Sequence, residues 1–139
     1  MNNRLGARSY VERAGSVLEE AKFLYDREKW NLVVRRCQEV VELALKGALL
    51  WAGVDFPRAH DVGATLRRNV DRFPEFFACN VPRMASLSRR LRAERELSFY
   101  GDEETGLPPE ELYSEDDARE ALAQAEWAWE LCDRLTQTS

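Results

Sequence analysis

The segment from Trp30 to Ala52 constrains the fold more than any other part of the chain. At about 100° per residue its apolar side chains fall on one side of a helix, and they are Val33, Cys37, Val40, Val41, Ala44, Ala48 and Trp51. This spacing predicts a long helix with one buried face. The opposite side carries a polar row flanked by three leucines, formed by Gln38, Glu42 and Lys46 with Leu43, Leu49 and Leu50. Such a row indicates a contact surface, although the segment itself does not identify the partner.

Four further segments carry helical signals. Ser9 and Glu12 form a capping-box pattern, which predicts a helix from Ser9 to about Glu28. Asp61 is the predicted N-cap of a helix that ends before Pro74. A short irregular or single-turn segment, PEFFACN, precedes a predicted helix from Asn80 to Gly101. An acidic loop, GDEETGLPPEELY, then leads to a last helix capped by Ser114.

These segments predict the fold class. Apolar residues alternate with the period of a strand nowhere in the chain. The sequence therefore predicts an all-α antiparallel bundle of four or five helices, of the up-and-down type. Its 139 residues are enough for one hydrophobic core, so we expect a single domain over residues 1–139.

Composition and the N-terminal segment predict the cellular location of the protein. The chain has no uncharged apolar run of roughly 18 residues or more, so we expect no membrane span. The N-terminal segment lacks the apolar stretch of a secretory signal, which predicts a cytoplasmic protein. The three cysteines are odd in number and widely spaced. Two of them, Cys37 and Cys132, lie on apolar helical stripes and are predicted to be buried free thiols.

Charge is distributed unevenly along the chain. Residues 1–100 contain 18 Lys and Arg against 13 Asp and Glu, whereas residues 101–139 contain 2 against 12. This asymmetry favours either a polyanion-binding face or an acidic terminal helix that docks on a basic surface. Arginine provides 17 of the 20 basic residues, and it suits forked recognition of phosphate or carboxylate. A composition bias of the genome gives the same enrichment without a functional reason.

His60 is the only histidine, which excludes several classes of site. A di-iron bundle and most zinc sites need more histidines or nearby cysteines. No serine stands in a nucleophile-elbow motif, and the chain has neither a Walker loop nor a glycine-rich dinucleotide motif. We therefore predict no metal and no cofactor. The pair of His60 and Asp61 at a helix start is more typical of capping than of catalysis.

Arg95 lies on the predicted helix from Asn80 to Gly101, about 50° from its inward stripe. A guanidinium so close to a buried seam must be paired or must line a wet cleft, because an unpaired buried charge is costly. Glu42 or one of the C-terminal acids is the expected partner in an ion pair. The alternative is an anion-binding cleft to which Tyr100 contributes a stacking or hydroxyl contact.

Several segments together resemble the HEPN family, small helical domains named for higher eukaryotes, prokaryotes and nucleotide binding. They are LEEAKFLY at 18–25, CQEVVELALKGALL at 37–50, the start of a helix at His60, Asp61 and Val62, and RELSFYGD at 95–102. The resemblance covers roughly residues 8–135. It implies a helical bundle, a homodimer, a cytosolic prokaryotic origin, and pairing with a minimal nucleotidyltransferase in toxin–antitoxin-like systems. Carried over by position, the implied cleft residues are Gln38, Glu42, Lys46, His60, Asp61, Arg95 and Tyr100.

The chain departs from the ribonuclease motif of that family, an arginine followed by histidine after four to six residues. The three positions where this arginine would precede His60 are occupied by Gly53, Val54 and Asp55. The leading hypothesis is therefore a non-catalytic HEPN protein that dimerises and binds a nucleotide, RNA or a partner nucleotidyltransferase. The first alternative is a divergent metal-independent ribonuclease that uses His60 and Arg95. The second is a purely structural interaction module whose surface is formed by the three leucines of the central helix.

Overall fold

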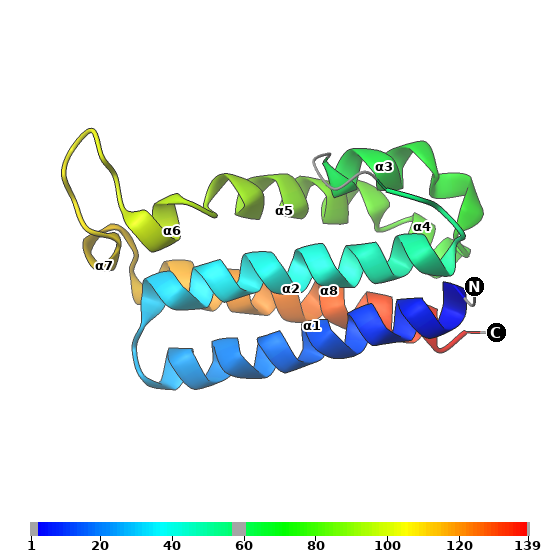
Figure 1. The fold of residues 1–139 in the computed structure, drawn as a ribbon, viewed down its shortest axis with the longest axis horizontal. Coiled ribbons are helices and arrows are strands. Elements are labelled where there is room, and N and C mark those ends of the chain that lie inside the picture. Colours follow the sequence, from blue (N-terminus) through cyan, green and yellow to red (C-terminus); the bar gives the residue numbers. More distant parts are fainter. Residues whose placement is uncertain (1–2, 57–60, 139) are drawn as a thin grey trace.

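Four long helices form the body of the protein in the computed structural model, which describes residues 3–56 and 61–138. They are α1 (Asn3–Asp26), α2 (Trp30–Trp51), α5 (Val81–Ala93) and α8 (Glu115–Thr136). Successive helices of this set run in opposite directions along the long axis (Figure 1). Within the described ranges no segment forms a β-strand. The predicted all-α bundle of the up-and-down type is confirmed.

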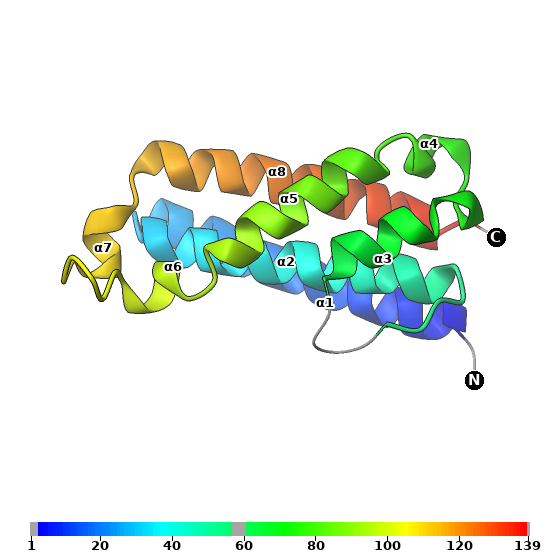
Figure 2. The ribbon, with the colours of Figure 1, turned by 90° about the horizontal axis from the view of Figure 1, so that it is seen from above.

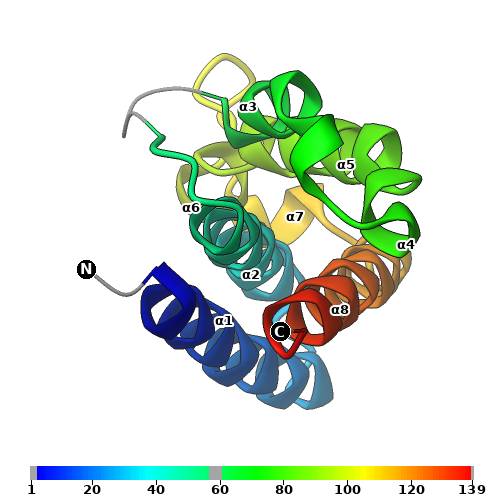
Figure 3. The ribbon, with the colours of Figure 1, turned by 90° about the vertical axis from the view of Figure 1, so that its right-hand side faces the viewer.

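α2 is the central helix. It packs between α1 and α8 on one side and the layer of α3 and α5 on the other (Figure 3). The contact with α1 is close at Gly47, where an added Cβ would lie 2.8 Å from Cγ2 of Val11 and 3.0 Å from the carbonyl oxygen of Ala7. The absence of a side chain at Gly47 therefore sets how near the two backbones come.

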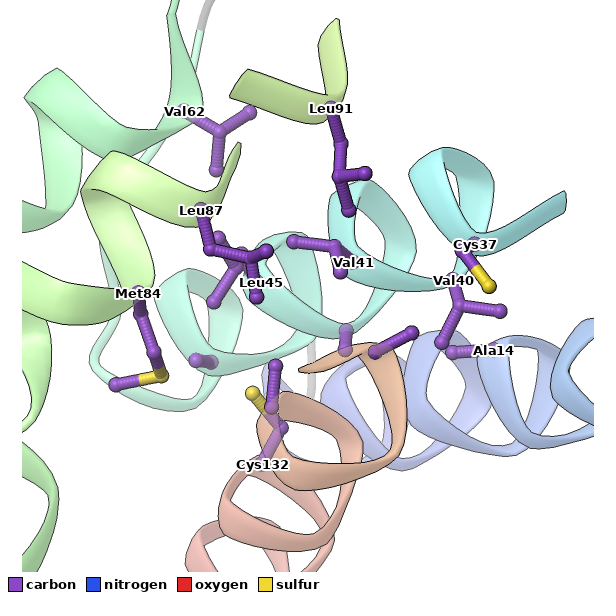
Figure 4. Close-up of a cluster of buried hydrophobic side chains, with 14 of the residues drawn as sticks. Ala14, Cys37, Val40, Val41, Leu45, Val62, Met84, Leu87, Leu91 and Cys132 are labelled. Carbon is purple, nitrogen blue, oxygen red and sulfur yellow. The ribbon is translucent and has the colours of Figure 1, made fainter. Parts of the chain in front are cut away.

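The core surrounds α2, with buried side chains from α1, α5 and α8 packed against it. Figure 4 shows Val41 and Leu45 of α2 lying toward Leu87 and Leu91 of α5, and all four are buried. Burial of these side chains supplies the main stabilisation of the α2–α5 contact.

The thiols follow the sequence prediction. Cys37 and Cys132 are buried and free, whereas Cys79 is exposed and free. Burial raises the pKa of the Cys37 thiol to about 12, because a thiolate is poorly solvated in the core. The same cause raises the pKa of Cys132. The two buried thiols act as small apolar side chains.

The first helix begins earlier than predicted. Ser9 was expected to cap it, but Ser9 lies inside α1, which the structure describes from Asn3. Tertiary contacts stabilise the extra turn: Ala7 is buried against α2, and Arg8 donates to Oδ1 of Asp133 and Oγ1 of Thr136 in α8. These contacts outweigh the local capping signal.

The segment after the α2–α3 connection is interrupted. α3 (Val62–Arg68) ends where the side chain of Asn69 donates to the carbonyl oxygen of Thr65 at 2.8 Å, and a 3₁₀ turn (Val70–Arg72) follows. The predicted continuous helix up to Pro74 is therefore wrong. The single turn predicted next is confirmed as α4 (Glu75–Ala78).

The predicted helix from Asn80 to Gly101 is also divided. α5 ends at Ala93, and α6 (Leu97–Tyr100) follows after three residues. The carbonyl oxygen of Arg95 accepts from the guanidinium of Arg35 and from Oγ of Ser98. These side-chain hydrogen bonds provide partners for a backbone carbonyl group between the two helices. α6 then stops at Gly101, whose φ of 82° suits glycine.

The acidic loop is more ordered than predicted. It contains an isolated bridge between Asp102 and Leu107 and the short helix α7 (Pro109–Leu112). The predicted cap of α8 is confirmed, because Oγ of Ser114 accepts from the backbone of Asp117 and the carboxylate of Asp117 accepts from the backbone of Ser114.

Among the described helices, none is long and apolar enough to cross a membrane.

Candidate functional site

The polar row of α2 does not line one cleft. Gln38 is buried, with 4% of its surface exposed, while Glu42 and Lys46 are half-buried. The ammonium of Lys46 lies 5.7 Å from the centre of the Phe56 ring. Gln38 is buried because neighbouring helices pack on most sides of α2.

The leucines beside this row do not form a common surface either. Leu49 is fully buried in the core, and Leu43 and Leu50 are half-buried. A docking surface formed by all three leucines is therefore wrong. The purely structural alternative loses the feature on which it depended.

Asp61 has the predicted role of an N-cap, and His60 lies outside the described residues. Oδ1 of Asp61 accepts from the backbone of Gly63 at 2.9 Å, and Oδ2 accepts from Nη2 of Arg89 at 3.0 Å. Burial raises the pKa of Asp61, but hydrogen bonds from Arg89, Gly63 and Ala64 outweigh it, so this pKa lies below its ordinary value. Asp61 thus joins the start of α3 to α5, which is a structural use of the carboxylate.

The region around α6 is where exposed aromatic and basic side chains meet. Phe99 and Tyr100 are 48% and 66% exposed, and their ring centroids lie 5.0 Å apart in an edge-to-face arrangement. The guanidinium of Arg35 lies 4.9 Å from the centre of the Phe99 ring. Arg95 is exposed beside them in the chain. We call Arg35, Arg95, Phe99 and Tyr100 the α6 site.

α6 is fixed to the central helix by two polar contacts. The buried side chain of Asn31 donates to the carbonyl oxygen of Ser98 at 3.1 Å. Arg35 donates to the carbonyl oxygen of Arg95. Since both donors belong to α2, the aromatic rings project from a turn that is held against the body of the protein. A fixed turn lowers the entropy cost of binding a ligand on these rings.

Arg95 and Glu42 do not form the ion pair that was considered from the sequence. No carboxylate in the described ranges pairs with Arg95, and Glu42 likewise forms no ion pair there. The expectation that Arg95 lies near a buried seam is wrong, because α5 ends at Ala93 and the helical wheel does not extend to Arg95. Its exposed guanidinium is available to an anion.

The predicted cleft residues therefore separate into three places. Glu42 and Lys46 lie on the half-exposed side of α2, Asp61 lies at the start of α3, and Arg95 and Tyr100 lie at α6. α3 begins above the middle of α2, whereas α6 lies near the end where α2 starts (Figure 2). Of the described candidates, only Arg95 and Tyr100 come together in one exposed site.

Sequence reasoning missed Arg35, Asn31 and Phe99. Phe99 stands within the segment RELSFYGD and directly precedes a predicted site residue, so two adjacent aromatics after an arginine were the available signal. Arg35 and Asn31 gave no such signal, because their role depends on a contact between α2 and α6. That contact appears only when the chain is folded.

Comparison with known proteins identifies the family. A search of curated proteins finds no match. A family model described as HEPN domain matches residues 7–135, nearly the whole length and every long helix of the bundle. The chain belongs to the HEPN domain family.

Proposed function

We propose that this HEPN domain binds a nucleotide, free or as part of an RNA strand, at the α6 site and does not cleave RNA. The observation that carries the proposal is the pair of exposed rings, Phe99 and Tyr100, with the guanidinium of Arg35 over Phe99 and the exposed Arg95 earlier in the same segment. Exposed aromatic faces stack with bases, and such stacking contributes about 1–3 kcal/mol per base. An unpaired guanidinium such as that of Arg95 suits the phosphate.

The absence of the ribonuclease motif supports binding without cleavage. No arginine precedes His60 at the spacing of that motif, and the chain has no second histidine. A general acid and base near neutral pH is what RNA cleavage requires, and histidine is the usual provider. The α6 site consists of arginine, phenylalanine and tyrosine side chains, which suit phosphate binding and base stacking.

The homodimer and the minimal nucleotidyltransferase partner come with the family resemblance, and both are proposals. Light scattering across a range of concentrations tests the homodimer: a mass of one chain at every concentration would contradict it. Co-purification with a nucleotidyltransferase from the same operon tests the partner. Neither result bears on whether a nucleotide binds at the α6 site.

Binding is tested by titration calorimetry with nucleoside monophosphates and with the matching nucleosides. We expect Phe99→Ala to weaken nucleotide binding by about fivefold or more, since one stacking contact is lost. Phe23→Ala is the matched control, because Phe23 is also an exposed phenylalanine, 56% exposed, with Arg27 over its ring at 4.6 Å, but it belongs to α1. Equal losses in the two variants, or no binding by the wild type, would contradict the proposal.

Cleavage is tested separately with end-labelled RNA in the presence of EDTA. We expect the RNA to remain intact. If the wild type cleaves the RNA and His60→Ala does not, the protein is the divergent ribonuclease and the non-catalytic proposal is wrong. If both cleave equally, the activity comes from a contaminant or from residues other than His60, and a repeat with Arg95→Ala separates the two.

A further inference from the structure

The layer formed by α3, α4 and α5 is strongly basic. From Val62 to Ala93 it contains seven arginines and two acidic residues, Asp71 and Glu75. All seven arginines are exposed. They are Arg67, Arg68, Arg72, Arg83, Arg89, Arg90 and Arg92. We call these residues the arginine face.

Most of this charge is not neutralised within the described chain. Among the residues that the structure describes, only Arg89 of this face pairs with a carboxylate, that of Asp61. Arg67 donates to the carbonyl oxygen of Pro82 and to Oγ of Ser86, and these neutral acceptors leave its positive charge uncompensated. Arg90 and Arg92 have no carboxylate partner among the described residues. The face therefore keeps a positive potential that attracts an anion.

The arginine face is continuous with the α6 site. α3 and α5 lie on the same side of the molecule, and α5 leads directly toward α6 (Figures 1 and 2). Arg67 connects α3 to the first half of α5. Arg89 and Arg92 are three residues apart on α5, and Arg95 follows in the break before α6. Exposed arginines thus follow one another along the chain from α5 toward the segment of Phe99 and Tyr100.

The acidic third of the chain borders this surface on one side: Arg90 of α5 shares a pocket with Asp117 and Glu120 of α8, and α7 packs against α6. α8 and the loop before it carry most of the twelve acidic residues of positions 101–139, against only two arginines. A polyanion is repelled from that side and attracted to the arginine face. This separation of charge favours one orientation of a bound strand, in which the phosphate backbone of the strand follows α5.

We infer that the arginine face binds the phosphate backbone of single-stranded nucleic acid whose terminal base stacks at the α6 site. This rests on the proposed function and extends it from a mononucleotide to a strand. Exposed guanidinium groups hold phosphates without reading sequence. The stacked base at Phe99 then fixes where the strand ends.

Fluorescence anisotropy with a labelled uridine oligonucleotide of about eight nucleotides, a typical length for single-strand sites, tests the inference against uridine monophosphate. We expect the oligonucleotide to bind at least about tenfold more tightly and its affinity to fall with salt. In the double variant Arg67→Gln and Arg92→Gln, the slope of log affinity against log salt is expected to decrease by about 1.4, since each phosphate contact contributes about 0.7. Monophosphate binding is expected to stay unchanged.

A matched control removes two arginines from another surface. Arg13 and Arg27 are exposed on α1, where they lie over the rings of Tyr10 and Phe23. Changing both to Gln gives the same loss of charge on the opposite side of the bundle (Figure 3). Affinity and salt slope are expected to match the wild type. The variant Arg67→Lys and Arg92→Lys keeps the charges and is expected to retain most of the affinity, which excludes misfolding as the cause.

The outcomes separate the two proposals. If the oligonucleotide binds no more tightly than the monophosphate, or if both Gln double variants lose affinity equally, the arginine face is not a strand-binding surface, and the proposed nucleotide site stands. If neither ligand binds, both proposals fail. The last measurement adds polyglutamate of equal charge as a competitor. If it displaces the oligonucleotide as effectively as unlabelled oligonucleotide does, the arginine face binds acidic protein instead of nucleic acid. A DNA oligonucleotide of the same length tells whether the strand must be RNA.

Discussion

Asn31 in α2 donates a hydrogen bond from Nδ2 to the carbonyl oxygen of Ser98 in α6, over 3.1 Å. Asn31 is 6% exposed and Ser98 is fully buried, so the bond is shielded from water. It connects the most central helix of the bundle with the turn that displays Phe99 and Tyr100. The exposed rings therefore depend on a residue that no ligand would touch.

Replacing Asn31 with alanine is expected to lower the free energy of unfolding by about 1–3 kcal/mol, because a buried carbonyl group loses its partner. The same change is expected to weaken nucleotide binding, since α6 is less fixed. Urea denaturation and calorimetry measure the two effects. Gln137→Ala at the exposed C-cap of α8 is the control, and its effect should stay within about 0.5 kcal/mol. Binding that is unchanged in Asn31→Ala would show that α6 is held by other contacts.

The sequence predicted the long helices because their apolar periodicity reflects burial. The helical period of α2 and the Ser114 capping box of α8 are local signals that packing reinforces. The break after Ala93 was not predictable, because it depends on side-chain bonds from Arg35 and Ser98 to the carbonyl oxygen of Arg95. The bond from Arg35 joins residues 60 positions apart and leaves no trace in the local pattern.

The candidate site was predictable only where its residues are neighbours in the chain. Arg95 and Tyr100 flank one segment and lie together at α6. Gln38, Glu42 and Asp61 were added by position, and the helices that cover Gln38 or bond Asp61 come from distant parts of the chain. A helical wheel gives the direction of a side chain but not the element that packs against it.

Gly47 is expected to tolerate no side chain. In Gly47→Ala the new methyl group would lie 2.8 Å from Cγ2 of Val11 and 3.0 Å from the carbonyl oxygen of Ala7. We expect the free energy of unfolding to fall by about 1–3 kcal/mol, since α1 must move away. Thermal or urea denaturation measures the change.

Gly6→Ala is the matched control for this substitution. Gly6 is also helical, and the nearest atom to an added Cβ, Cδ1 of Leu50, is at an ordinary distance of 3.5 Å. Because alanine favours a helix more than glycine does, stability is expected to rise by up to about 1 kcal/mol. A stabilising Gly47→Ala would show that the α1–α2 contact adjusts easily.

Stability is expected to depend on the ionisation of Asp61 at acid pH. Its pKa in the folded protein lies below the ordinary value of 3.8 because Arg89, Gly63 and Ala64 stabilise the carboxylate. The carboxylate therefore stabilises the fold at pH values above 3.8, and this contribution is lost as the pH falls through the lower folded pKa. The cap and the partly exposed ion pair together contribute about 1 kcal/mol.

Asp61→Ala tests this dependence through urea denaturation at several pH values. The difference in unfolding free energy between wild type and variant is expected to be largest near neutral pH and to shrink below pH 3.8. Arg89→Gln keeps the cap and removes the charge, so a smaller difference is expected from it. A difference that is constant over the whole pH range would show that the carboxylate contributes nothing through its charge.

The three thiols are expected to react at very different rates with a thiol reagent in the folded protein. Cys79 is exposed, whereas Cys37 and Cys132 are buried, and burial raises the pKa of Cys37 to about 12. Since the thiolate is the reactive form, only Cys79 should be modified quickly at pH 8. Mass spectrometry of the native and the urea-unfolded protein counts the labels. A second rapid label on the native protein would mean that the bundle opens near α2 or α8, and peptide mapping of the labelled Cys79→Ser variant would show which of the buried thiols reacts.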